Sequence, residues 1–208
     1  LQDPQAQRWF ALAADQSERG EPLGAIESLK RALSIEPDAA HAHALLAHCL
    51  LASRRPHAAA HEAAIALNLA PSEGSSHFAM AVVCLAQRDW RRAAVHLDLA
   101  QADDPEDPNV RRARAQLFEL TGQQKRIRPE LEAALTLEPD SPTSLAALGS
   151  YHLGRGEVPR AKELALQALQ IAPQHGTALV LMGHTLLREG ETAGAQEHAV
   201  WALRIGPP

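Results

Sequence analysis

Prolines that return at a constant interval are the feature of this 208-residue chain that most constrains its fold. Self-similarity at a period of 20 to 50 residues is typical of repeat architectures, in which each unit packs on its neighbours. An ordinary helical bundle imposes no constant spacing on its loops, so the pattern disfavours one. Six prolines lie 34 residues apart: Pro37, Pro71, Pro105, Pro139, Pro173 and Pro207.

Small residues return with the same period as the prolines. Five residues before each proline stands an alanine: Ala32, Ala66, Ala100, Ala134, Ala168 and Ala202. Twenty-four residues before each proline stands an alanine or a glycine: Ala13, Ala47, Ala81, Ala115, Gly149 and Gly183. Small side chains let two helices approach closely, and only 3% of the residues are aromatic, which favours close-packed helices over sheets. Each unit is therefore predicted to fold as a helical hairpin.

Glycines divide four of the six predicted hairpins into a first helix, a short turn and a second helix. Gly20, Gly122, Gly156 and Gly190 occupy one repeat position, where a left-handed cap would end the first helix. The proline that closes each unit cannot continue the second helix and so begins the next loop. Twelve helices in six hairpins, an all-α fold, are expected.

The spacing resembles the tetratricopeptide repeat (TPR), a 34-residue pattern of large, small and closing proline residues. The fit is best in the fifth unit, at Leu145, Leu148, Gly149, Ala161, Ala165, Ala168 and Pro173, and good in the first, at Trp9, Leu12, Ala13, Ala25, Leu29, Ala32 and Pro37. The resemblance implies a right-handed superhelical solenoid of six helix-turn-helix hairpins, with first helices lining a concave groove and second helices outside. It makes residues 1–208 one array with repeats at 6–39, 40–73, 74–107, 108–141, 142–175 and 176–208.

The junction between the third and fourth units departs from the pattern. Gln101 and Asp103 replace two aliphatic residues that would pack on the following unit, and Arg114 replaces a leucine of the receiving helix. Losing two buried aliphatic side chains costs more than an ion pair at a partly wet junction returns. We therefore expect this junction to be the weakest, with Asp103 or Asp104 paired to Arg111 or Arg114.

Pro129 falls inside the expected second helix of the fourth unit. Its ring would clash with a preceding carbonyl, so this helix is predicted to begin late, near Arg128, after a longer connection. The segment is open to two interpretations: a tolerated irregularity, or a hinge or binding loop that carries Lys125, Arg126 and Arg128.

Composition and motifs disfavour several classes of function. A net charge of −5 lacks the basic footprint of a nucleic-acid binder, and no apolar run is long enough to cross a membrane. No phosphate loop, nucleophile elbow or paired nucleophile and base occurs, so the chain is predicted not to be an enzyme and to need no cofactor. His57 and His61 have a spacing that suits a metal, but no further ligand falls at a recognisable distance in the sequence, so no metal site is expected. Cys49 and Cys84 are interpreted as buried reduced thiols, which makes the cytoplasm the default compartment.

Candidate partner-binding residues follow from the family's groove positions on the first helices. By analogy they are Phe10, His41, Leu45, His48, Phe78, Val82, Arg112, Gln116, Leu181 and His184. The apolar members in the first half could form a stripe for an extended peptide or one face of a helix, or could pack between helices. The family's clamp for a chaperone carboxylate needs Lys and Asn where this chain has Phe10 and Ala14, so that ligand is not expected.

The resemblance implies a non-catalytic scaffold that binds a protein or peptide, as a fragment of a longer, bacterial-style chain. Self-assembly is a second interpretation, since Trp201, Leu203 and Ile205 on the last helix have no following hairpin to cover them. A third is a targeting module for an enzyme or membrane protein whose other domain lies elsewhere in the chain.

Overall fold

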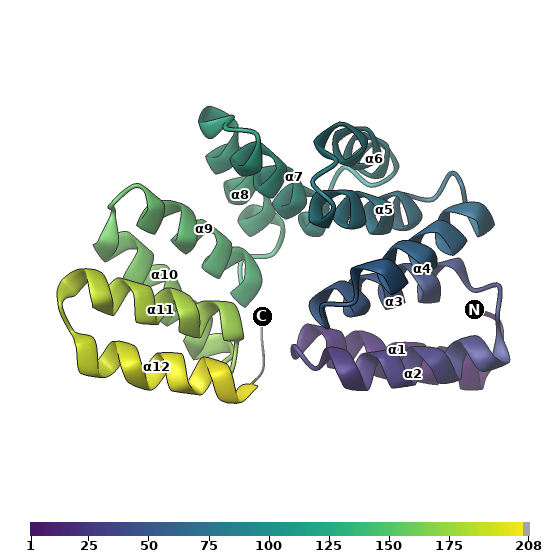
Figure 1. The fold of residues 1–208 in the computed structure, drawn as a ribbon, viewed down its shortest axis with the longest axis horizontal. Helices are drawn as coiled ribbons and strands as arrows, with labels where there is room; N and C mark the ends of the chain where they lie inside the picture. The colour runs from purple at the N-terminus through teal and green to yellow at the C-terminus, as the bar shows by residue number, and fades with distance from the viewer. Residues whose placement is uncertain (206–208) are drawn as a thin grey trace. The chain divides into compact units, whose positions relative to one another are not determined.

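The computed structural model describes residues 1–205, with side chains through Arg204. In this part of the chain all regular secondary structure is helical, short loops join the helices, and there is no strand (Figure 1). The predicted all-α class is confirmed. The helices are α1 (Pro4–Glu18), α2 (Pro22–Ile35), α3 (Ala40–Ala52), α4 (Pro56–Leu69), α5 (Gly74–Ala86), α6 (Trp90–Asp103), α7 (Pro108–Leu120), α8 (Gln124–Leu137), α9 (Pro142–Gly154), α10 (Val158–Ile171), α11 (Gly176–Glu189) and α12 (Thr192–Ile205).

Consecutive helices pair as six hairpins, which we number from hairpin 1 (α1 and α2) to hairpin 6 (α11 and α12). The chain forms two compact units, the first covering Leu1–Glu106 and the second beginning at Asp107, and we describe each by itself. Within each unit the first helix of a hairpin packs on the second helix of the preceding one. The boundary coincides with the junction expected to be weakest. The single array, and an ion pair across that junction, stay predictions.

The recurring small residues lie where helices meet. Within hairpins 1 to 3, Ala13, Ala47 and Ala81 on the first helices are fully buried. On the second helices the alanines five residues before each closing proline are at most 5% exposed. A larger side chain at such a contact overpacks it, at a cost of about 1–3 kcal/mol. The packing therefore explains why small residues keep the same period as the prolines.

The turn inside each hairpin requires a left-handed backbone at one repeat position. Glycine occupies it in hairpins 1, 4, 5 and 6, where φ is +76° at Gly20, +73° at Gly122, +80° at Gly156 and +84° at Gly190, as the sequence predicts. In hairpins 2 and 3 the same position holds arginine, with φ of +57° at Arg54 and +62° at Arg88. A residue with a Cβ pays about 1–2 kcal/mol for this conformation.

Arg54→Gly and Arg88→Gly are each expected to raise the free energy of unfolding by about 0.5–1 kcal/mol, because glycine relieves the left-handed strain but is more flexible in the unfolded chain. Both arginines are exposed, so few contacts are lost. Urea unfolding of the two variants and the parent measures the gain. Gly122→Arg is the reverse control, and its free energy of unfolding should fall by a similar amount. Equal stability of all four proteins would show that arginine is not strained at this position.

The expected late start of the second helix in hairpin 4 is wrong. Helix α8 begins at Gln124 and includes Pro129, and its length of 14 residues matches the other second helices. The first turn is tightened, because the amide of Arg126 donates to the carbonyl of Gln123, three residues back, at 2.9 Å. In hairpin 5 the corresponding bond runs over four residues, from Ala161 to Glu157. Helix α8 therefore includes Pro129 without beginning later than the other second helices.

Candidate partner-binding face

The first unit carries most of the candidate residues on its first helices. Helix α3 packs on α5 and also contacts α1, so these three helices lie side by side. Four apolar side chains on them are only half-buried: Phe10, Leu45, Phe78 and Val82. Phe10 and Phe78 occupy the same repeat position in hairpins 1 and 3, and Val82 lies one helical turn after Phe78. We call these four residues the apolar stripe.

Two exposed histidines accompany the apolar stripe on α3. His41 lies at the start of the helix, where its Nε2 is 3.4 Å from a carboxylate oxygen of Glu73 in the loop before α5. His48 lies two turns further along the same helix and is also exposed. The face thus combines an apolar surface with imidazole groups, which can both donate and accept hydrogen bonds.

The candidate residues of the second unit differ in character. Gln116 and His184 are exposed. Arg112 is held by its own unit, since its guanidinium donates to Ser144 Oγ at 2.6 Å, to Glu138 at 3.3 Å and to Asn109 at 2.6 Å. These bonds fix the position of Arg112 but occupy donors that a ligand would need.

Leu181 is buried, so the prediction that it lines a binding face is wrong. It is 2% exposed and packs in a core with Leu153, Ala161 and Met182. The repeat position of Phe10 and Phe78 falls in hairpin 6 on Val180, which is half-buried, and Leu181 is the next residue. One residue turns the side chain by about 100° around a helix, which points it into the packed interior. Leu45 in hairpin 2 is likewise one residue beyond that position, but it is half-buried and so keeps part of its surface accessible.

A set of polar pairs inside the hairpins was missed by the sequence analysis. Residues 19 apart meet at one repeat position in three consecutive hairpins, where both partners are ionisable. The pairs are His43 with Glu62 at 2.6 Å, His77 with His96 at 3.1 Å, and Arg111 with Glu130 at 3.2 Å. In hairpin 5 the same place holds Leu145 and Leu164, which are buried. Aligning the units at 34 residues and comparing positions 19 apart would have found the set.

Hairpin 4 holds the largest ionic group of this set. Glu130 accepts from Arg111 at 3.2 Å and from Arg114 at 3.1 Å, and its side chain is only 13% exposed. Arg126 lies over the ring of Phe118, with its guanidinium 3.9 Å from the ring centroid. Arginines in this hairpin therefore stabilise the fold through a carboxylate and an aromatic ring.

The last described helix exposes apolar side chains. Leu203 is 81% exposed, Trp201 52% and Val200 46%. Val200 and Trp201 line a shallow hollow together with Glu197 and Arg204. Ile205 was also predicted to be uncovered, but its side chain lies outside the part that the structure describes.

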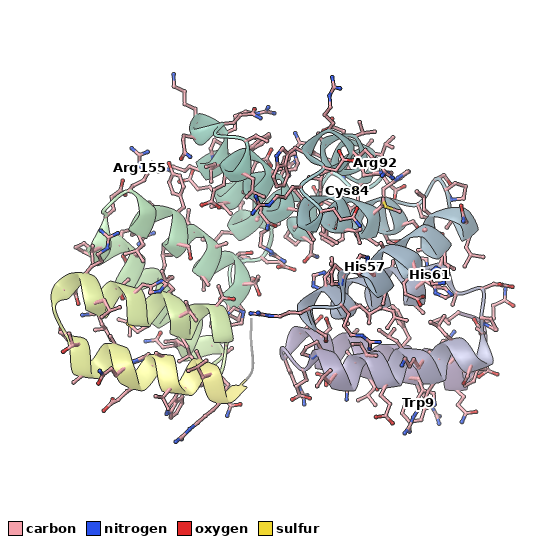
Figure 2. All side chains as sticks on the ribbon, in the orientation of Figure 1. Trp9, His57, His61, Cys84, Arg92 and Arg155 are labelled. Atoms are coloured by element: carbon pink, nitrogen blue, oxygen red, sulfur yellow. The ribbon has the colours of Figure 1, made fainter. Side chains whose placement is uncertain are left out.

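The described residues also bear on metal ligands, thiols and membrane-spanning helices. Residues 1–204 hold no group of three or more His, Cys, Asp or Glu that could bind a metal ion, although His57 and His61 lie on α4 (Figure 2). Cys49 and Cys84 are buried free thiols, and burial raises the pKa of each. None of the twelve helices has the length and apolar character that spanning a membrane requires.

Residues 17–73 match the family model of the tetratricopeptide repeat. The hairpins on both sides of this segment repeat its 34-residue period and its helix pairing, so the resemblance to the tetratricopeptide repeat predicted from the sequence is confirmed. No curated protein sequence matches the chain.

Solved structures of TPR proteins share the fold. A TPR protein of Thermus thermophilus is 21% identical, with a TM-score of 0.74 over 88% of this chain and 99% of that chain. The pilF protein of Pseudomonas aeruginosa is 20% identical, with a TM-score of 0.60 over 97% of this chain and 91% of that chain. YrrB, described as a TPR protein with an unusual peptide-binding site, is 18% identical, with a TM-score of 0.50 over 87% of this chain and 93% of that chain.

Proposed function

We propose that the chain is a non-catalytic protein-binding module whose first unit binds an extended peptide or the apolar face of a helix. The apolar stripe carries this proposal. Buried positions on the same helices are filled by residues such as Ala47 and Ala81, yet the stripe keeps large side chains that are only half-covered. Incompletely covered apolar surface is the usual basis for recognition of an apolar helix face.

The flanking polar groups fit the same kind of ligand. His41 and His48 add hydrogen-bonding groups beside the apolar stripe, which would fix the register of a bound peptide. Peptide binding by the structurally similar YrrB supports the proposal by analogy of fold. In the second unit, taken by itself, the exposed Gln116 and His184 are further candidates for partner binding, whereas the donors of Arg112 are already engaged.

Phe78→Asp is expected to weaken ligand binding at least about tenfold, because a carboxylate would have to be desolvated against an apolar ligand. A phage-displayed library of amphipathic helical peptides, selected against the whole chain, supplies the ligands. Titration calorimetry then compares the variant with the parent, and circular dichroism checks that helicity is retained.

Val95→Asp is the matched control, because Val95 is an exposed apolar residue, 57% accessible, on the second helix of the same hairpin. It should leave binding unchanged. Equal losses of ligand binding in the two variants would contradict a site on the first helices. A loss of helicity in Phe78→Asp alone would show that Phe78 packs between helices rather than binding a ligand.

Self-association through α12 is the second candidate function, favoured by the exposure of Trp201 and Leu203. Light scattering at increasing protein concentration separates the candidates. A monomer throughout would remove support from self-association, whereas a concentration-dependent mass that disappears in Leu203→Asp would establish it.

We also assign the chain to the bacterial cytoplasm. Two buried free thiols suit a reducing compartment, and the similar structures from Thermus and Pseudomonas support a bacterial origin.

A further inference from the structure

Two histidines of hairpin 3 face each other through the same ring nitrogen. Nδ1 of His77 on α5 lies 3.1 Å from Nδ1 of His96 on α6, and the ring centroids are 5.3 Å apart. His77 is 9% exposed and His96 is half-buried. In a hydrogen bond between two imidazole nitrogens, one carries the hydrogen and the other offers its lone pair. The contact therefore forms when the rings are neutral or share one extra proton, but two imidazolium rings would set N–H against N–H.

The surroundings of the pair oppose a second proton. Burial, the ring of His77 and the guanidinium of Arg92 lower the pKa of His96 below its usual value. Arg92 lies on α6 (Figure 2), four residues before His96 in the sequence, and Asp89 caps the start of this helix by accepting from the amide of Arg92. On its other sides α5 packs on α3 and α4, where the carboxylate of Glu62 is already paired with His43. The remaining ionisable groups of those helices and of the preceding loop are His41, His48, Cys49, His57, His61 and Glu73.

The neighbouring hairpin provides an internal contrast at the same repeat position. Nδ1 of His43 lies 2.6 Å from the carboxylate of Glu62, and its Nε2 lies 2.8 Å from the carbonyl oxygen of Pro37. Both partners are hydrogen-bond acceptors, so a doubly protonated ring satisfies them both. The hydrogen-bond geometry of hairpin 2 therefore accommodates a charged ring, whereas the equivalent contact in hairpin 3 does not accommodate two of them.

We propose that the His77–His96 contact makes hairpin 3 open in mild acid while hairpin 2 stays closed. Below about pH 6.5 the unfolded segment takes up a proton on each ring, whereas the closed hairpin takes up fewer. The state that binds more protons is favoured as the pH falls, so the closed hairpin loses stability between about pH 6.5 and pH 5, above the range where carboxylates titrate. This inference does not depend on the proposed function. If the apolar stripe binds a ligand, however, opening of hairpin 3 would also move Phe78 and Val82 away from that ligand.

Hydrogen exchange of the whole chain, corrected for intrinsic exchange rates and read by mass spectrometry, tests the proposal. Between pH 7.5 and pH 5.5, the protection of amides in α5 and α6 is expected to fall about tenfold. This is the change in the opening equilibrium when the open hairpin binds one proton more than the closed hairpin over one pH unit. Protection in α3 and α4 should stay level or rise. Unchanged protection of α5 and α6 would overturn the proposal.

The chain supplies its own matched variants. His77→Leu/His96→Leu installs the pair that hairpin 5 has at Leu145 and Leu164, and His96→Glu installs the pair that hairpin 2 has. Both should abolish the acid response of α5 and α6. A response that persists in either variant would assign it to other groups and contradict the proposal. If the double leucine variant does not fold, His96→Glu alone decides.

Discussion

Replacing Leu181 by alanine is expected to lower the free energy of unfolding of the second unit by about 3 kcal/mol. Leu181 is 2% exposed and belongs to a core that joins hairpins 5 and 6, including Leu153 and Met182. Removal of a buried leucine loses the transfer free energy of its methyl groups and leaves a cavity that the surrounding helices fill only in part. Urea unfolding, with hydrogen exchange read on α9 to α12, measures the loss.

Gly149 provides the control for this variant, because a Cβ added there would overlap a methyl group of Leu181. Gly149→Ala alone should destabilise the unit through overpacking, and in the Leu181→Ala background it should be tolerated or stabilising. If the effects of the two substitutions on the free energy of unfolding were additive, the contact between residue 149 and Leu181 would be contradicted. A normal stability of Leu181→Ala would instead return Leu181 to the list of candidate binding residues.

Replacing Glu130 by alanine is expected to cost the second unit about 3 kcal/mol. The carboxylate accepts from both Arg111 and Arg114 in a place only 13% exposed, and hydrogen bonds to charged groups contribute about 1.5–3 kcal/mol each. Removing the shared acceptor takes the compensating charge away from two partly buried guanidinium groups. Thermal and urea unfolding measure the effect.

Glu132→Ala is the surface control, since Glu132 pairs with Arg128 at 2.7 Å but both side chains are about half exposed. It should cost about 0.5 kcal/mol or less. A second control replaces Arg111, Arg114 and Glu130 together by leucine, the residues that hairpin 5 has at Leu145, Leu148 and Leu164. This variant should recover most of the loss, because well-packed leucines can replace a buried ionic group. Equal costs for Glu130→Ala and Glu132→Ala would contradict the importance of burial.

The hairpins could be predicted from the sequence because their determinants are local and repeated. Proline and glycine mark the loops, and alanine marks the places where helices touch. Pro129 shows the limit of such rules, because α8 begins at Gln124 and includes the proline although the proline was expected to delay its start.

The candidate site was harder to predict because orientation around a helix changes with every residue. Half-buried Phe10 and Phe78 lie at one repeat position, whereas Leu181 was assigned one residue away from it and is buried. The ionisable pairs within hairpins were missed because their partners are on different helices. Arg111 and Arg114 were expected to pair across the junction, and within their own unit both bind Glu130.

Deletion of one complete repeat tests most directly whether each 34-residue segment folds as an interchangeable hairpin. Removing residues 142–175 takes out α9 and α10, whereas removing residues 142–156 takes out α9 and leaves α10 without its partner. Circular dichroism of the two shortened chains during urea unfolding is the measurement. The first deletion should keep the parent's ellipticity per residue and a cooperative transition, and the second should lose helicity in the second unit. Equal damage from both deletions would contradict a repeat built from two-helix units.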